Sequence, residues 1–92
     1  MMTDLPEVRH ARITWRCRRG MRELDLLLEK FLLSGLTSLD DDDLDRLEHL
    51  LTQPDQDILA WLTSAVSSED GEIRRIVTVL RRSIYPPPNA HE

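Results

Sequence analysis

Aromatic and cysteine residues are scarce in this sequence. Of the 92 residues, only 4% are aromatic, and Cys17 is the single cysteine. Folds that stack nucleic-acid bases need several exposed rings, so the scarcity counts against an RRM or OB type of surface. One cysteine forms no internal disulfide and suits a reducing compartment. We therefore expect a cytoplasmic protein in which Cys17 is a buried structural thiol.

Long apolar runs are also missing. No run approaches the roughly 20 residues of a transmembrane helix, and no basic start followed by an apolar stretch indicates a secretion signal. The chain is also short. A domain of this size has little room for both a packed core and a deep substrate pocket, which counts against an enzyme. The three histidines are scattered along the chain. We expect no membrane insertion, no enzymatic activity, and neither catalytic nor metal-binding residues.

Charge is abundant but unevenly distributed. The formal net charge is −5, yet six of the twelve basic residues are arginines within residues 9–22, where there is no carboxylate. Most of the seventeen carboxylates lie within residues 23–72. A basic segment on an acidic body can orient an anionic partner, either a nucleic acid or an acidic protein surface.

Apolar residues recur at helical spacing, and no stretch alternates long enough to predict a strand. The pattern predicts an all-α fold of five short helices in one compact domain over residues 1–85. The first helix follows Pro6 and runs to about Cys17, and Gly35 ends the second. Asp40 is expected to cap the third.

Polar residues mark the last two helices and the end of the domain. We expect Asp55 to cap the fourth helix and Ser67 or Ser68 to start the fifth. Three consecutive prolines begin at Pro86, and no apolar stripe follows them. Residues 86–92 are therefore expected to form a disordered, Pro-rich tail that contributes little to folding.

The expected core consists of the apolar residues that repeat every three or four positions within each helix. The first helix has two such stripes, one of Val8, Ala11 and Trp15 and a neighbouring one of Ile13 and Cys17. The other stripes are Leu24, Leu27, Leu28, Phe31 and Leu32; Leu44, Leu47 and Leu51; Ile58, Leu59, Leu62 and Val66, with Trp61 at the margin; and Ile73, Ile76, Val77 and Leu80.

The junction between the first two helices is the strongest candidate for a recognition site. Residues 18–25 place three arginines, a methionine and two carboxylates around Gly20. Glycine at a junction can take a positive φ or allow a partner's backbone to approach closely. A solvated helix entry is an equally good interpretation from these residues alone, because charged clusters are common at helix ends.

The same residues resemble a known family. Residues 11–13, Trp15 and residues 17–25 are similar to the hallmark of the succinate dehydrogenase assembly factors of the SdhE type. The family's RGxxE signature corresponds here to Arg19, Gly20 and Glu23. The partner-binding residues that the resemblance implies are Arg12, Trp15, Arg19, Gly20, Met21, Glu23 and Asp25.

The resemblance also implies a function. Family members are five-helix factors that bind the flavoprotein subunit of succinate dehydrogenase, and often that of fumarate reductase, and promote covalent attachment of FAD to its histidine. This sequence has no GxGxxG fingerprint. We therefore expect FAD to belong to the partner, with no cofactor bound stably by this chain, which is expected to be a monomer.

A nucleic-acid-binding regulator is the alternative function. An Arg-rich helical segment can lie along phosphates, as residues 9–22 would. The net charge of −5 and the acidic body count against this alternative. A gel-shift experiment at low salt separates the two hypotheses, and we expect no binding of nucleic acid.

Overall fold

Five α-helices make up the part of the chain that the computed structural model describes, residues 5–86. They are α1 (Pro6–Arg16), α2 (Arg22–Ser34), α3 (Asp41–Leu50), α4 (Asp55–Thr63) and α5 (Gly71–Ile84), with a 3₁₀ turn, η1 (Leu36–Ser38), after α2. No strand occurs within these residues, so the predicted all-α, five-helix fold is confirmed. Across them, no helix combines the length and the apolar character needed to span a membrane. Apart from Pro86, the expected tail lies outside the described residues.

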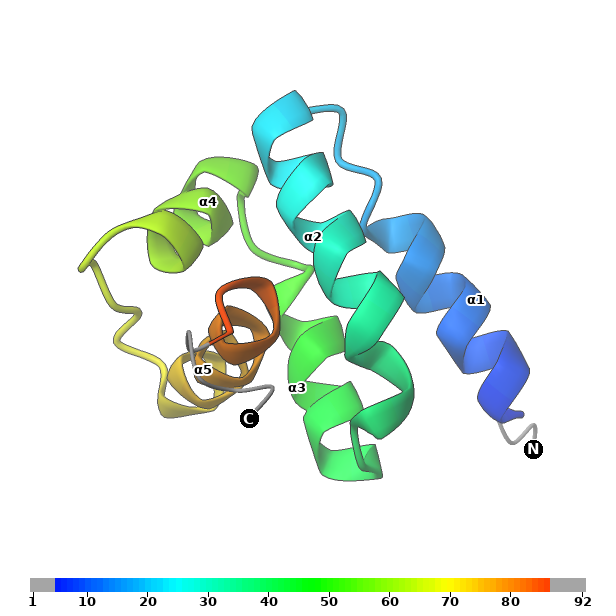
Figure 1. The fold of residues 1–92 in the computed structure, drawn as a ribbon. Coiled ribbons are helices and arrows are strands. Elements are labelled where there is room, and N and C mark those ends of the chain that lie inside the picture. The colour runs from blue at the N-terminus through cyan, green and yellow to red at the C-terminus, as the bar shows by residue number, and fades with distance from the viewer. Residues whose placement is uncertain (1–4, 87–92) are drawn as a thin grey trace.

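Helix α2 runs through the middle of the molecule. Figure 1 shows α1 along one side of α2, with α3, α4 and α5 gathered on the other. Helix α5 packs against α2, α3 and α4, so these four helices enclose one core. The predicted stripes of α2, α3 and α5 face it, with Leu27 and Leu32 only partly buried. The largest fully buried side chains are Phe31, Ile13, Leu24, Leu28, Leu47, Leu50, Ile58, Leu62, Ile76, Leu80 and Ile84.

Two aspartates cap helices. The Asp40 carboxylate accepts a 2.8 Å hydrogen bond from the backbone N–H of Asp43, as predicted for the start of α3. Asp70 caps α5 by accepting hydrogen bonds from the first N–H groups of the helix. The expected start at Ser67 or Ser68 is therefore wrong. The Ser68 hydroxyl instead accepts a 3.0 Å hydrogen bond from the N–H of Asp70, and so shapes the loop that leads into the cap.

The expectations for α4 need two corrections. Its N-cap is Pro54, whose side chain makes no capping hydrogen bond, and Asp55 is the first residue of the helix rather than its cap. The Asp55 carboxylate instead binds Arg19, as described below. Val66 lies beyond the end of α4 and is 57% exposed, so it does not belong to the core.

The buried face of α1 is the second of its two apolar stripes. Ile13 and Cys17 are buried, whereas Val8, Ala11 and Trp15 are exposed. Only one side of α1 is covered, because the helix lies at the edge of the bundle (Figure 1). Ion pairs also join α1 to α3, and these pairs cannot be read from the apolar pattern.

Replacing Trp61 by alanine measures how much a partly buried ring contributes to the stability of the fold. Its side chain is half-buried and packs against the core cluster. A fully buried tryptophan replaced by alanine costs about 3–5 kcal/mol, so we expect Trp61→Ala to cost about 2 kcal/mol. A urea melt measures this value. A loss below about 1 kcal/mol would show that the indole contributes little packing.

Candidate functional site

Gly20 gives the loop between α1 and α2 its shape. Its φ is +83°, in the left-handed region, which is one of the two roles that the sequence allowed for this glycine. No atom lies within 4 Å of the position that a Cβ would occupy. The backbone conformation, rather than crowding, therefore requires glycine here, and the space beside the loop is open to an approaching partner.

Asp25 holds this loop against the first turns of α2. One carboxylate oxygen accepts a 2.8 Å hydrogen bond from the N–H of Arg19. The other accepts a 3.1 Å hydrogen bond from the N–H of Gly20. Asp25 therefore fixes the backbone on which the signature residues lie.

The Arg19 side chain points into the domain. Its Nε donates to Asp55 at 2.7 Å, and its terminal nitrogens donate to the carbonyls of Leu51 at 2.8 Å and Gln53 at 3.0 Å. Only 14% of the side chain is exposed. Arg19 thus ties the α1–α2 loop to the turn between α3 and α4. Its contact with a partner stays a prediction, whereas its contribution to the fold is visible.

Arg12 and its neighbours fasten α1 to α3. Glu48 accepts hydrogen bonds from Arg9 at 2.7 Å and Arg12 at 2.9 Å, and Arg16 lies 3.7 Å away. Arg9 also binds Asp45. Four of the six arginines in residues 9–22 therefore pair with three carboxylates within the domain. That the chain binds no nucleic acid stays a prediction.

The Glu48 cluster predicts a stability that falls in acid. Burial disfavours the charged carboxylate, but the hydrogen bonds and charges of Arg12 and Arg9 outweigh it and lower the pKa of Glu48 from its usual 4.5. The folded state then binds fewer protons than the unfolded state, so this stabilisation is present above about pH 4.5 and is lost as the pH falls through the lowered pKa. Urea melts at several pH values should show a shallower acid loss for Glu48→Gln. An acid loss as steep as in the wild type would show that Glu48 does not contribute to it.

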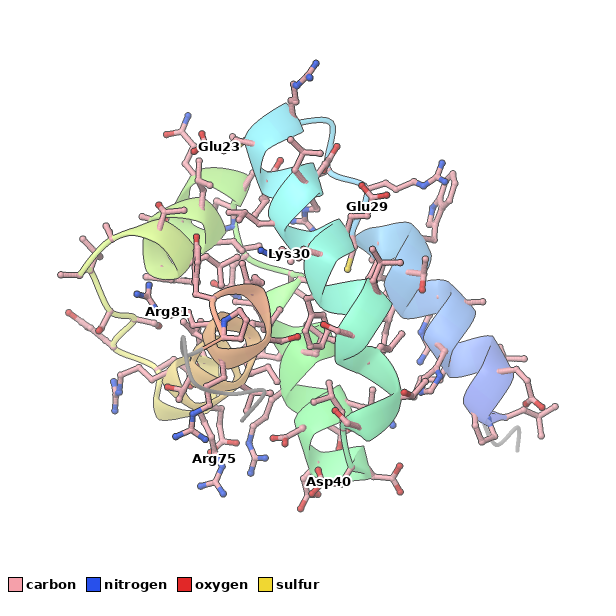
Figure 2. All side chains as sticks on the ribbon, viewed as in Figure 1. Glu23, Glu29, Lys30, Asp40, Arg75 and Arg81 are labelled. Atoms are coloured by element: carbon pink, nitrogen blue, oxygen red, sulfur yellow. The ribbon has the colours of Figure 1, made fainter. Side chains whose placement is uncertain are left out.

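Five residues near the junction of α1 and α2 are exposed, and we call this set the exposed edge: Trp15, Arg18, Gly20, Arg22 and Glu23. The Trp15 ring is 70% exposed, and the Arg18 guanidinium lies 5.9 Å from its centroid. Figure 2 shows Glu23 at the start of α2. The edge thus combines an aromatic ring, two cations and a carboxylate.

The seven predicted site residues consequently divide into two groups. Trp15, Gly20 and Glu23 are exposed, whereas Met21 is half-buried and packs against the core cluster. Arg12, Arg19 and Asp25 are held by contacts within the chain. Within the second group, Arg19 and Asp25 hold the α1–α2 loop that carries Gly20, whereas Arg12 fastens α1 to α3.

A groove beside this edge was not predicted. It has a volume of about 760 Å³ and is lined by Thr14, Cys17, Arg18, Gly20, Asp25, Glu29, Leu32 and Leu33. Leu33 is 83% exposed. Figure 2 shows Glu29 on the side of α2 that faces the α1–α2 loop. Leu26 and Leu33, seven residues apart outside the buried stripe of α2, were the signal in the sequence that could have revealed an apolar outer face.

Cys17 provides no nucleophile at neutral pH. Burial raises the pKa of its thiol to about 11, the charge of Arg19 acts in the opposite direction, and Asp25 adds to the rise. The side chain is 4% exposed. The expectation of a buried structural thiol is confirmed.

Comparison with known proteins identifies the family that this chain resembles. Residues 11–84 match the family described as "Flavinator of succinate dehydrogenase". A protein of Pseudomonas savastanoi named FAD assembly factor SdhE is 39% identical over 80 residues, which cover 87% of this chain and 95% of that protein. A Legionella pneumophila protein of the same name is 41% identical over 71 residues, or 77% of this chain and 89% of its own length. A third, from Pseudomonas aeruginosa, is 36% identical over 85 residues, or 92% and 99%.

Proposed function

The chain belongs to the succinate dehydrogenase flavinator family, and from this premise we propose that it is an assembly factor that promotes FAD attachment to the flavoprotein subunit of succinate dehydrogenase. The observation that carries the proposal is the family match over residues 11–84, which includes Arg19, Gly20 and Glu23 of the signature. The relatives named FAD assembly factor support the same function.

The exposed edge would contact the flavoprotein. Trp15 offers a large apolar ring, Arg18 and Glu23 offer charges of both signs, and Gly20 leaves room for close approach. Arg19 and Asp25 act as positioning residues, because they fix the loop without facing solvent freely. In an interface that carries charges of both signs, complementary charges on the two partners select the correct partner and fix its orientation.

The factor would act by positioning. Once docked, it would hold the flavoprotein so that the histidine that receives FAD lies at reacting distance from the flavin. Correct placement alone can lower a barrier by several kcal/mol, so no catalytic group on this chain is required.

Other aspects of the function follow as parts of the same proposal. FAD remains on the flavoprotein, and fumarate reductase is a further client. The factor works as a monomer in the cytoplasm, a reducing compartment in which a free cysteine such as Cys17 stays reduced.

Co-expression with the flavoprotein subunit tests the proposal. Covalent flavin resists denaturation, so its fluorescence in a denaturing gel measures attachment. We expect the signal to rise strongly when the factor is present. Equal fluorescence with and without the factor would contradict the proposed function.

A further inference from the structure

Helix α5 carries four arginines for which the described residues provide no carboxylate partner: Arg74, Arg75, Arg81 and Arg82. By contrast, most arginines of the Arg-rich segment and Arg46 of α3 are paired with carboxylates. The chain as a whole has a net charge of −5. The outer face of α5 is thus a cationic surface on an acidic protein.

Two of these arginines also bind backbone carbonyls outside α5, Arg81 those at the end of α4 and Arg74 one in the loop that precedes α5. One terminal nitrogen of Arg81 donates to the carbonyls of Leu62 at 3.0 Å and Trp61 at 3.2 Å. Arg74 donates to the Ser68 carbonyl at 2.8 Å. Each guanidinium has five N–H donors, so further donors remain available for an anion. Figure 2 shows Arg81 on the loop side of α5 and Arg75 directed outward.

The surface is hollowed at two places beside Arg81. One hollow of about 300 Å³ is lined by Trp61, residues 64–68, Arg74, Val77, Thr78 and Arg81. The other, of about 350 Å³, is lined by Thr78, Arg81, Arg82 and Tyr85. Both share Thr78 and Arg81, and no carboxylate is among the lining residues of either. Together they form a cationic recess large enough for one or two side chains.

We propose that this face of α5 is a second docking surface, which binds a Glu- and Asp-rich segment of a partner protein, with one carboxylate side chain in the recess between Arg74 and Arg81. Arg75 and Arg82 flank the recess and bind neighbouring carboxylates. Guanidinium groups pair with carboxylates through two parallel hydrogen bonds, which gives such a surface directional specificity. The surface is separate from the exposed edge and does not depend on the proposed function.

A polypeptide fits this surface better than a nucleic acid. Helix α3 packs directly on α5 and begins with Asp41, Asp42 and Asp43. A nucleic acid carries a phosphate at every nucleotide, so beyond the short basic face it would meet these carboxylates and be repelled, whereas a peptide can carry its acidic residues only where it faces the arginines. The recess accepts a side chain, whereas it offers no row of aromatic rings for stacking bases.

The test measures binding of a fluorescent, synthetic Glu- and Asp-rich peptide to the whole protein by anisotropy at low salt. The α5 variant is Arg75→Glu with Arg82→Glu, two exposed residues, and the matched control is Arg22→Glu with Lys30→Glu on α2. Both double variants change the net charge equally. A third variant, Thr78→Trp, fills the recess without changing charge.

We expect the α5 variant to bind the peptide at least about tenfold more weakly than the wild type, and the control to stay within about twofold of it. Thr78→Trp should also weaken binding, while circular dichroism shows all variants to be folded. If the α5 variant and the control variant weakened peptide binding equally, the effect would come from net charge alone, and the proposal would be overturned. Wild-type-like binding by Thr78→Trp, no binding at low salt, or tighter binding of duplex DNA would overturn it as well.

Discussion

Arg19→Glu is expected to lower the free energy of unfolding by about 2–3 kcal/mol, less than the roughly 3–5 kcal/mol for a fully buried ion pair, because 32% of the Asp55 side chain is exposed. The substitution removes the donors to Asp55 and to the carbonyls of Leu51 and Gln53. It also brings a second carboxylate next to Asp55 in a place where only 14% of the Arg19 side chain is exposed. For a domain of this size, such a loss is a large part of the total stability.

Urea denaturation followed by circular dichroism measures this effect. Arg22→Glu is the matched control, because Arg22 lies close by, is exposed and makes the same change of charge. We expect the control to alter stability by less than about 0.5 kcal/mol. Equal midpoints for the wild type and Arg19→Glu would show that the inward contacts of Arg19 do not stabilise the fold. A loss of stability would also affect functional tests of this variant. Loss of flavin attachment by Arg19→Glu would then not identify Arg19 as a contact residue, because the fold itself is weakened.

Substitution of Gly20 by arginine is expected to abolish assistance of flavin attachment while leaving a folded protein. The positive φ of +83° makes any side chain cost about 1–2 kcal/mol in backbone strain. No atom lies within 4 Å of a Cβ at this position, so no steric clash within the domain adds to the backbone strain. A long side chain, however, would occupy the space through which the flavoprotein approaches.

Gly20→Ala separates these two effects. Alanine introduces the same backbone strain as arginine but almost no bulk, so both variants should show similar urea midpoints. Covalent flavin fluorescence should fall much further with arginine than with alanine. Equal loss of fluorescence would assign the effect to loop conformation, and wild-type fluorescence with Gly20→Arg would place the docking surface elsewhere.

The helices that bury a regular stripe were predictable from the sequence. Leu24, Leu28 and Phe31 repeat along one face of α2 and form the centre of the core, because apolar burial follows directly from helical spacing. Asp40 was recognisable as a cap, since its carboxylate satisfies a nearby N–H of its own helix. Local features of this kind depend on neighbours within a few residues.

The contacts that organise the site could not be predicted in this way. The partners of the Arg19 guanidinium between α3 and α4, namely Leu51, Gln53 and Asp55, lie 32 to 36 residues away in the sequence. Asp55 has the local features of a cap, but the approach of Arg19 gives its carboxylate another partner. The partner of Arg12 is likewise distant, since Glu48 lies on α3, and the stripe of Trp15 and Val8 is exposed although it is as apolar as the buried one.

The central claim is that the exposed edge, rather than the inward-facing part of the signature, meets the flavoprotein. Covalent flavin fluorescence of the co-expressed flavoprotein tests it most directly, with Glu23→Arg compared with Glu69→Arg. Both glutamates are exposed, so neither variant should disturb the fold. We predict that Glu23→Arg loses most of the signal while Glu69→Arg keeps the wild-type level. Wild-type fluorescence with a folded Glu23→Arg protein would contradict the claim.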